Sequence, residues 1–462
     1  MTLIASVSGI RGTIGGAVST NLTPLDIVSF AAAYGSWLKS NHKEVCTVVI
    51  GRDARISGPM VQQLVQQTLV GLGIDVIDVG LSTTPTVEME VVRQMAQGGI
   101  ILTASHNPKE WNALKLLNAK GEFISKTDGE ALMGYIENQT FDFAAVDMLG
   151  KISHCNDALE AHIDQILALP LVDVNAIKAA NFNVVVDGVN SSGGVAVPKL
   201  LDVLGVRLTE IHCIPNGNFP HNPEPLKEHL TDLADAVLRH NAHLGIAVDP
   251  DVDRLVFMDE KGELFGEEYT LVACADYVLK HKKGAVVSNL SSSRSLADLA
   301  KSHGVDYHAS AVGEVHVVDK MKAVHAVIGG EGNGGVILPS LHYGRDALVG
   351  IALFLSHLAH ERKTVSALKS DYSHYVMVKQ KIELSPEWDS EALLAYVAKY
   401  FNNENVTTTD GVKIDFEHSW IHLRKSNTEP ILRLYAEAKT KTHILEQIKK
   451  VERVIKTFDA SI

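Results

Sequence analysis

A short apolar run ends in a polar, glycine-rich break in the stretch Asn183-Val184-Val185-Val186-Asp187-Gly188-Val189-Asn190-Ser191-Ser192-Gly193-Gly194. An apolar run of this length is typical of a buried strand, and the break is typical of a loop that leads into a helix. The same pattern occurs at residues 47–55 and 285–293. Three such strand–loop–helix repeats predict α/β domains.

The C-terminal part of the chain has a different pattern. Residues 412–416 alternate between apolar and polar side chains, and residues 420–423 and 431–436 resemble further strands. Apolar residues then recur at helical spacing from Ile444 to Phe458. This predicts an α+β domain at the end of the chain. We therefore expect four domains, which span residues 1–150, 151–260, 261–365 and 366–462.

Composition narrows the class of protein. The chain has 462 residues, of which 46% are hydrophobic and 21% charged, as in soluble globular proteins. A formal net charge of -13 disfavours nonspecific binding to nucleic acid or to an anionic membrane, because both require a basic face. The four cysteines form no CxxC pair, and neither a signal peptide nor a membrane-spanning run is found. We therefore expect a cytoplasmic protein.

Ser105 lies in the stretch Thr103-Ala104-Ser105-His106-Asn107-Pro108, directly after the apolar run of residues 99–102. This order predicts a hydroxyl on a loop at the end of a strand, where a substrate can reach it.

Three carboxylates follow another apolar run, in the stretch Asp249-Pro250-Asp251-Val252-Asp253-Arg254. Alternate residues of an extended segment point the same way, so the three carboxylates can converge. Ligands that are all oxygen suit Mg²⁺. An EF-hand loop is excluded because Arg254 stands where that loop requires glycine. A solvated acidic turn is the alternative for an isolated pattern of this kind.

Three further segments could bind an anion or a sugar. Residues 424–430, followed by Arg433, have the composition of a phosphate cradle, although an ordinary polar hairpin loop is the commoner use of such residues. Five glycines in residues 329–335 would let the backbone approach a ligand, and a flexible turn is the alternative. A nucleotide fingerprint is rejected there because an apolar run follows instead of a helix. Glycines also flank Arg11, which could present its guanidinium to an anion.

Taken in chain order from Ser8 to Arg433, these segments resemble the α-D-phosphohexomutase family. That family includes phosphoglucomutases, phosphomannomutases and phosphoglucosamine mutases. The resemblance implies three related α/β domains and a C-terminal α+β domain around a central cleft. It also implies an isomerase that interconverts hexose 1-phosphate and 6-phosphate through a phosphoserine and a bisphosphorylated sugar.

The resemblance assigns roles to individual residues. It implies that Mg²⁺ is held by Asp249, Asp251, Asp253 and a phosphate oxygen on Ser105. Residues around the reacting phosphoryl group would be Arg11, His106, Lys115 and Arg254, with Lys115 as the candidate proton shuttle. Residues that bind the sugar and its distal phosphate would be Glu331, Asn333, Arg424, Ser426, Asn427, Thr428 and Arg433.

Two departures from the family pattern affect the proton path and the sugar. Many members read Gly-Glu-x-Ser-Gly-His in the sugar loop, whereas this chain has Asn333 in place of serine and Gly335 in place of histidine. The loop at residues 312–316 lacks the lysine or arginine that many members carry. The form of the sugar loop favours glucosamine phosphate, and glucose and mannose phosphates stay open.

Other classes of function also stay open at this stage. A phosphosugar phosphatase could use the same serine, and a phosphosugar-binding protein could lack catalysis. A hexose 1,6-bisphosphate is the expected activator and intermediate, and we expect a monomer or a homodimer.

Overall fold

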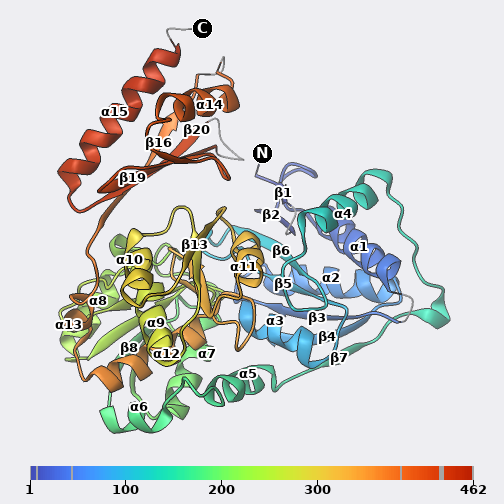
Figure 1. The fold of residues 1–462 in the computed structure, drawn as a ribbon. Coiled ribbons are helices and arrows are strands. Elements are labelled where there is room, and N and C mark those ends of the chain that lie inside the picture. The colour runs from blue at the N-terminus through green and yellow to red at the C-terminus, as the bar shows by residue number, and fades with distance from the viewer. Residues whose placement is uncertain (1, 7–8, 43–44, 386–387, 426–430, 460–462) are drawn as a thin grey trace. The chain divides into compact units, whose positions relative to one another are not determined.

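All three strand–loop–helix repeats that the sequence predicts are present in the computed structural model, which describes residues 2–6, 9–42, 45–385, 388–425 and 431–459 (Figure 1). Strand β3 (Thr47–Arg52) leads to α2 (Gly58–Gly71), β8 (Asn183–Asp187) leads to α7 (Gly193–Val203), and β12 (Val286–Asn289) leads to α10 (Arg294–Ser302). The predicted α/β class is therefore confirmed.

The chain divides into two units. One comprises residues 1–277 and 333–368, and the other comprises residues 278–332 and 369–462. The domain boundaries near residues 150, 260 and 365 stay predictions.

A seven-stranded sheet begins the first unit. In sheet order its strands are β1 (Ile4–Ser6), β2 (Gly9–Thr13), β6 (Trp111–Leu117), β5 (Gly98–Leu102), β3, β4 (Asp75–Leu81) and β7 (Ile152–His154). Strands β5, β3, β4 and β7 are parallel, whereas β6 is antiparallel to both β5 and β2. The helices of this segment are α1 (Pro24–Asn41), α2, α3 (Thr84–Arg93) and α4 (Lys126–Asn138).

The central strands of this sheet are buried on both faces. Val48 and Ile50 belong to one apolar core, while Val49 belongs to another that also contains Val87 and Val91 of α3. Alternation of side chains along a strand produces these two cores, and it explains why β3 is apolar at successive positions. The loops after β3 and β5 meet at the same edge because these strands are parallel.

A four-stranded sheet completes the first unit, with the order β11 (Leu255–Met258), β10 (Leu244–Val248), β8 and β9 (Arg207–Ile211). Strands β10 and β9 are parallel to β8, whereas β11 is antiparallel to β10. The other elements up to residue 281 and from 333 to 369 are α5 (Ala158–Leu167), α6 (Val174–Ala180), α8 (Thr231–Arg239), α9 (Glu267–His281), β15 (Gly335–Ile337), α12 (Ala347–Glu361), α13 (Val365–Lys369) and the short helices η1 (Val146–Met148) and η2 (Lys227–His229).

The second unit contains parallel and antiparallel strands. Strand β12 pairs in parallel with β13 (Tyr307–Ser310) and β14 (Ile328–Glu331), and α11 (Glu314–Ala323) precedes β14. The antiparallel sheet has the order β16 (Val376–Glu383), β20 (Ile431–Ala438), β19 (Ser419–Lys425), β18 (Val412–Asp415) and β17 (Asn405–Thr407), with helices α14 (Ser390–Tyr400) and α15 (Lys441–Asp459). Ile444, Ile448 and Val451 of α15 are buried, which confirms the predicted amphipathic helix and the α+β end of the chain.

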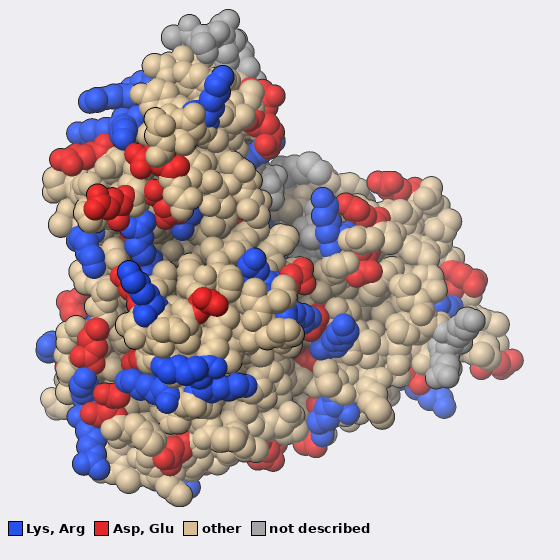
Figure 2. Space-filling model, in the orientation of Figure 1, with Lys and Arg blue, Asp and Glu red and all other residues tan. Residues whose placement is uncertain are grey.

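Acidic and basic side chains are interspersed over the face drawn in Figure 2. This mixed pattern and the net charge of -13 disfavour a broad basic surface on that face. Among the described residues, no helix combines the length and the apolar character that crossing a membrane requires.

Helix α1 begins with a capping box, and its loss gives a test of local stability. The backbone N–H of Asp26 donates to the Thr23 side chain, and the backbone N–H of Thr23 donates to Asp26 Oδ2 at 3.0 Å. We expect Thr23→Ala to lower the free energy of unfolding by about 1 kcal/mol, because an N–H at the helix start loses its acceptor. Urea unfolding followed by circular dichroism would measure this change. Thr140→Ala, at an exposed loop position, is the control, and an equal change in both variants would contradict the prediction.

Candidate functional site

Ser105 lies on a strained loop between β5 and β6. Its backbone φ is +50°, in the left-handed region that residues other than glycine rarely occupy, and the residue is only 8% exposed. Its backbone N–H donates to Thr103 Oγ1 at 3.0 Å. Strain of this kind persists only where the surroundings enforce it, and it is frequent at functional sites.

Arg55, in the loop after β3, holds the loop of residues 103–110, called the serine loop below, in place. Its side chain is fully buried, and Nε donates to Asp53 Oδ2 at 3.0 Å. Its terminal nitrogens donate to three backbone carbonyls of that loop, those of Ser105 (2.5 Å), Asn107 (2.6 Å) and Pro108 (2.6 Å), and to the carbonyl of Trp111 at the start of β6 (3.0 Å). The sequence interpretation assigned no role to Arg55. The available signal was its place after a predicted strand, two residues beyond an aspartate.

The loop after β10 carries three fully buried carboxylates, those of Asp249, Asp251 and Asp253. Val252 between them has φ +63°, which is costly for a β-branched residue. Two backbone N–H groups of the same loop, those of Asp253 and Arg254, donate to Asp249 Oδ1 at 3.1 Å each. The hydroxyl of Ser105 donates to Asp249 Oδ2 at 2.7 Å, so the two motifs predicted to share a centre do meet.

Two cations compensate the buried carboxylates. Lys115 Nζ lies 2.7 Å from Asp251 Oδ2 and 3.2 Å from Asp253 Oδ2, and Arg345 lies 2.7 Å from Asp253 Oδ2. Burial alone would raise the pKa of Asp253, but Arg345 and Lys115 outweigh it and hold that pKa below its usual range. Burial would likewise lower the pKa of Lys115, and the charges of Asp251 and Asp253 reverse this and raise it.

The same loop also fits a divalent cation. One oxygen of each of the three carboxylates lies within 4.8 Å of the others. The Oδ1 atoms of Asp251 and Asp253 are buried without a hydrogen-bond partner among the described residues. Burial, and then the charges of Asp251 and Asp253, raise the pKa of Asp249 well above its usual range. Unpaired carboxylate oxygens that repel one another are a donor set suited to a hard cation such as Mg²⁺.

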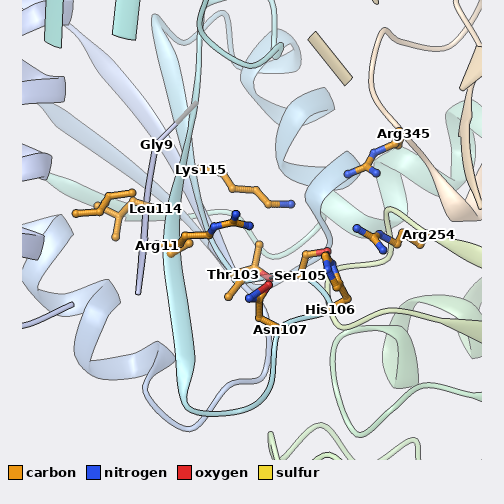
Figure 3. A pocket seen from close by; sticks show the side chains of 13 residues that line it. Gly9, Arg11, Thr103, Ser105, His106, Asn107, Leu114, Lys115, Arg254 and Arg345 are labelled. Atoms are coloured by element: carbon orange, nitrogen blue, oxygen red, sulfur yellow. Dashed lines mark hydrogen bonds between the residues drawn. The ribbon is translucent and has the colours of Figure 1, made fainter. Parts of the chain in front are cut away.

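A pocket of about 270 Å³ opens beside Ser105 (Figure 3). Four cationic side chains reach into it from separate elements, namely Arg11 of β2, Lys115 of β6, Arg254 and Arg345. His106 also lines the pocket, and burial followed by the charge of Arg254 lowers its pKa well below the usual range. Such a concentration of fixed cations around one hydroxyl is suited to a phosphate dianion.

Arg345 occupies the space beside Gly335, the position where the family pattern has histidine. A Cβ atom added to Gly335 would lie 2.3 Å from Cδ of Arg345, far inside van der Waals contact. The guanidinium continues into the pocket and pairs with Asp253. Arg345 was not among the residues predicted from the sequence, since residues ten apart give no sign of sharing one place.

The remaining predicted residues are placed as follows. Glu331 ends β14 in the second unit, where Oε1 accepts from Asn289 Nδ2 at 2.9 Å and from the Gly313 N–H at 3.0 Å. Asn333 belongs to the first unit, and its Oδ1 accepts from the Gly335 N–H at 3.2 Å.

The phosphate-binding segment is described in part. Arg424 of β19 pairs with Asp410 at 2.8 Å, and it lies opposite Arg433 of β20 in the sheet register. Ser426, Asn427 and Thr428 lie outside the described residues.

Comparison with known proteins gives matches along the chain. Four family models match, described as phosphoglucomutase/phosphomannomutase alpha/beta/alpha domains I (residues 3–143), II (160–262) and III (266–375) and the C-terminal domain (378–454). A phosphoglucomutase/phosphomannomutase of Thermococcus kodakarensis is 35% identical over 96% of this chain and 99% of its own length. A probable phosphoglucosamine mutase of Pyrococcus abyssi is 32% identical over 97% of each chain. The crystal structure of a phosphoglucomutase/phosphomannomutase family protein from Burkholderia thailandensis superposes with a TM-score of 0.85 at 25% identity, covering 98% of this chain and 97% of the other.

Loss of Arg55 should free the serine loop. We expect Arg55→Met to lower the free energy of unfolding by about 3–5 kcal/mol, because Asp53 and four carbonyls lose a buried partner. Differential scanning calorimetry would measure it against Arg207→Met, a substitution at an exposed arginine of β9. A variant as stable as this control would show that Arg55 does not hold the loop.

Proposed function

The chain belongs to the phosphoglucomutase/phosphomannomutase family, and we propose that it interconverts the 1-phosphate and the 6-phosphate of glucosamine through a phosphorylated Ser105. It is an isomerase of the phosphohexomutase type. The observation that carries the proposal is the 2.7 Å contact between Ser105 Oγ and Asp249, in a pocket that four cationic side chains enter.

Ser105 acts as a reusable phosphoryl carrier in this proposal. The phosphoserine gives its phosphoryl group to the free hydroxyl of a hexose phosphate, which produces a hexose 1,6-bisphosphate. The bisphosphate then turns around and returns its other phosphoryl group to Ser105. Fixed positive charge supports both transfers, because a phosphoryl group in transit carries charge on its oxygens. Arg11, Arg254 and Arg345 supply that charge from the protein.

Lys115 handles the proton. The attacking hydroxyl must lose a proton in each transfer, and the leaving oxygen must gain one. Lys115 Nζ is held beside the serine by Asp251 and Asp253, and its raised pKa favours the ammonium form. As an ammonium it returns a proton to the leaving oxygen, and as an amine it accepts one from the attacking hydroxyl. His106 would contact the phosphoryl group as a neutral imidazole, consistent with its lowered pKa.

Asp249, Asp251 and Asp253 would hold Mg²⁺, with a phosphate oxygen on Ser105 as a further ligand. When bound, the ion supplies positive charge next to the oxygens of the phosphoryl group. The unpaired Oδ1 atoms of Asp251 and Asp253 support this assignment.

Substrate binding uses the other predicted residues. Glu331 and Asn333 would hydrogen-bond to the sugar hydroxyls, while the distal phosphate would be held by Arg424, Ser426, Asn427, Thr428 and Arg433. Glucosamine is favoured over glucose and mannose by the form of the sugar loop and by relatives that carry the name phosphoglucosamine mutase. Among the described residues the four cysteines, which are Cys46, Cys155, Cys213 and Cys274, form no disulfide, and this agrees with a reducing cytoplasmic setting. We expect a monomer or a homodimer.

Removal of the serine hydroxyl tests the carrier. We expect Ser105→Ala to lower kcat by at least about a thousandfold, because no phosphoenzyme can form. Intact-mass spectrometry should find a phosphorylated fraction in the native protein and none in the variant. Ser302→Ala, at an exposed position of α10, is the control. Full activity of Ser105→Ala would exclude the proposal.

A panel of three substrates tests the sugar. We expect kcat/KM to be highest for glucosamine 1-phosphate, compared with glucose and mannose 1-phosphates, with Mg²⁺ and the matching 1,6-bisphosphate supplied. A coupled assay for each 6-phosphate product would measure it. Release of inorganic phosphate without a 6-phosphate would instead identify a phosphatase, and binding without turnover would identify a non-catalytic binding protein.

A double substitution can test whether Arg345 takes the place of the histidine that many family members have at the position of Gly335. We expect Arg345→Ala to lower kcat by about a hundredfold, because one fixed charge near the phosphoryl group is lost. Gly335→His alone should be poorly tolerated, since Arg345 fills the space. The pair Gly335→His with Arg345→Ala should recover part of kcat relative to Arg345→Ala. Steady-state kinetics of the three variants would show this, and strictly additive losses would contradict it.

A further inference from the structure

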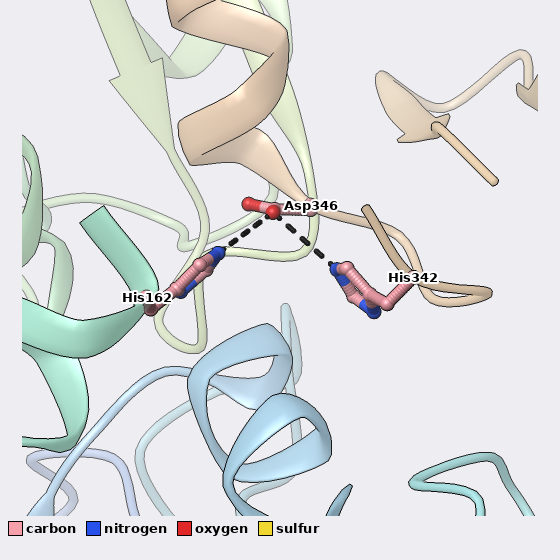
Figure 4. A group of neighbouring side chains, drawn as sticks. All are labelled: His162, His342 and Asp346. Carbon is pink, nitrogen blue, oxygen red and sulfur yellow. Dashed lines mark hydrogen bonds and ion pairs between the residues drawn. The ribbon is translucent and has the colours of Figure 1, made fainter. Parts of the chain in front are cut away.

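A second group of metal-ligating side chains lies apart from the three aspartates. It consists of His162 of α5, His342 in the loop before α12, and Asp346 at the N-cap of α12 (Figure 4). Both histidines present Nε2 to one oxygen, Asp346 Oδ2, at 2.9 Å for His162 and 3.4 Å for His342. The side chains of His162 and Asp346 are 1% and 0% exposed, and that of His342 is 12% exposed.

The spacing of these atoms fits a small metal ion. A tetrahedral zinc ion with ligands at about 2.0–2.1 Å keeps neighbouring ligand atoms roughly 3.3 Å apart. The two measured separations bracket that value, and all three atoms lie within 4.8 Å of one another. Asp346 Oδ1 accepts from the N–H groups of Leu348 and Val349, at 2.8 and 3.3 Å. The helix cap therefore fixes the carboxylate with its second oxygen toward the histidines.

An oxygen atom of α3 lies beside the outer nitrogen of each histidine, at hydrogen-bond distance for His162 and at ion-pair distance for His342. His162 Nδ1 lies 2.9 Å from Thr86 Oγ1, and His342 Nδ1 lies 3.4 Å from Glu88 Oε2. When Nδ1 carries the proton and donates it to the neighbouring oxygen, the Nε2 lone pair is free to bind a metal; Thr86 Oγ1 can accept such a hydrogen bond or donate one. A carboxylate in this position is the common outer partner of a zinc-bound histidine. The group thus combines three candidate ligand atoms with an oxygen atom beside the outer nitrogen of each histidine.

We propose that His162, His342 and Asp346 bind a divalent transition-metal ion of the zinc class, at a structural site distinct from the magnesium site. Two imidazoles and one carboxylate are ligands that zinc prefers and magnesium does not. Three protein ligands leave one position for water. The ion would join α5 to the loop that carries Arg345, because Asp346 directly follows Arg345.

Hydrogen bonds join the neighbours of this site to the loop of the three aspartates. The N–H of Ala347, next to Asp346, donates to the Val252 carbonyl at 3.2 Å. Thr84, at the start of α3, donates its hydroxyl to Asp251 Oδ2 at 2.6 Å. Helix α12, which begins at the proposed zinc site, and α3, which carries Thr86 and Glu88, thus both contact the aspartate loop.

Protonation of His342 is the alternative to a metal ion bound by these three side chains. Burial lowers the pKa of His342, but Asp346 and Glu88 outweigh burial and raise that pKa to about 10. A protonated His342 would preserve the same hydrogen bonds without any metal. A protonated site and a metal-bound site differ in metal content and in the spectrum of a cobalt derivative. The experiment therefore measures these two quantities.

The test uses the full-length protein after treatment with a chelator. The protein is then loaded with zinc, and excess ions are removed in the presence of millimolar Mg²⁺. Bound zinc is measured by plasma mass spectrometry. We expect one equivalent of tightly held zinc, which excess Mg²⁺ does not displace. Cobalt should give the visible absorption of a tetrahedral N/O site. Retention of no stoichiometric zinc, or of zinc that Mg²⁺ displaces, would overturn the proposal.

Substitutions assign the ion to these ligands. His342→Gln should weaken zinc binding by at least about a hundredfold, and Glu88→Gln, which touches only an outer nitrogen of the site, should weaken it about tenfold to a hundredfold. The matched control is His212→Gln, in a separate group where His212 and His221 each lie 3.0 Å from Asp187. Loss of the zinc in the control, with retention in His342→Gln, would place the metal elsewhere. If His342→Gln does not fold, Glu88→Gln and the cobalt spectrum decide the question.

Discussion

Three buried carboxylates on one short loop are the constraint on which the site beside Ser105 depends. Asp249, Asp251 and Asp253 are fully buried, and uncompensated carboxylates would cost several kcal/mol each at that depth. The compensating groups come from distant parts of the chain, Lys115 from β6 and Arg345 from the loop before α12. The need to neutralise this loop therefore draws separate segments to one point, and that point is the proposed site of phosphoryl transfer.

Strain and burial act together at the serine. Ser105 and Val252 both have left-handed backbone conformations, at φ +50° and +63°. Arg55 supports the first through four carbonyls, and the hydrogen bonds to Asp249 support the second. A hydroxyl held in this way undergoes little reorganisation when charge develops, which is the advantage of a preorganised site.

The side chain of Arg345 lies beside Gly335, the position at which the family pattern has histidine. Gly335 leaves room for the arginine side chain, which enters the same pocket from ten residues downstream. A permanent cation cannot exchange protons as imidazole can, so Lys115 would carry proton transfer by itself. A metal ion at the proposed zinc site would fix the segment from which Arg345 extends, because its ligand Asp346 directly follows Arg345.

The sequence by itself determined the α/β repeats and the α+β character of the C-terminal part of the chain. These follow from local patterns, because strand and helix periodicity are written in neighbouring residues. The association of Ser105 with the three aspartates was implied by the resemblance to the phosphohexomutase family, and no local pattern contains it. Only the tertiary structure decided that Arg55 holds the serine loop, that Arg345 fills the space at Gly335, and that His162 meets His342 and Asp346. Those contacts join residues far apart in the chain or on different elements. Their distances depend on how helices pack on sheets, which no local pattern records.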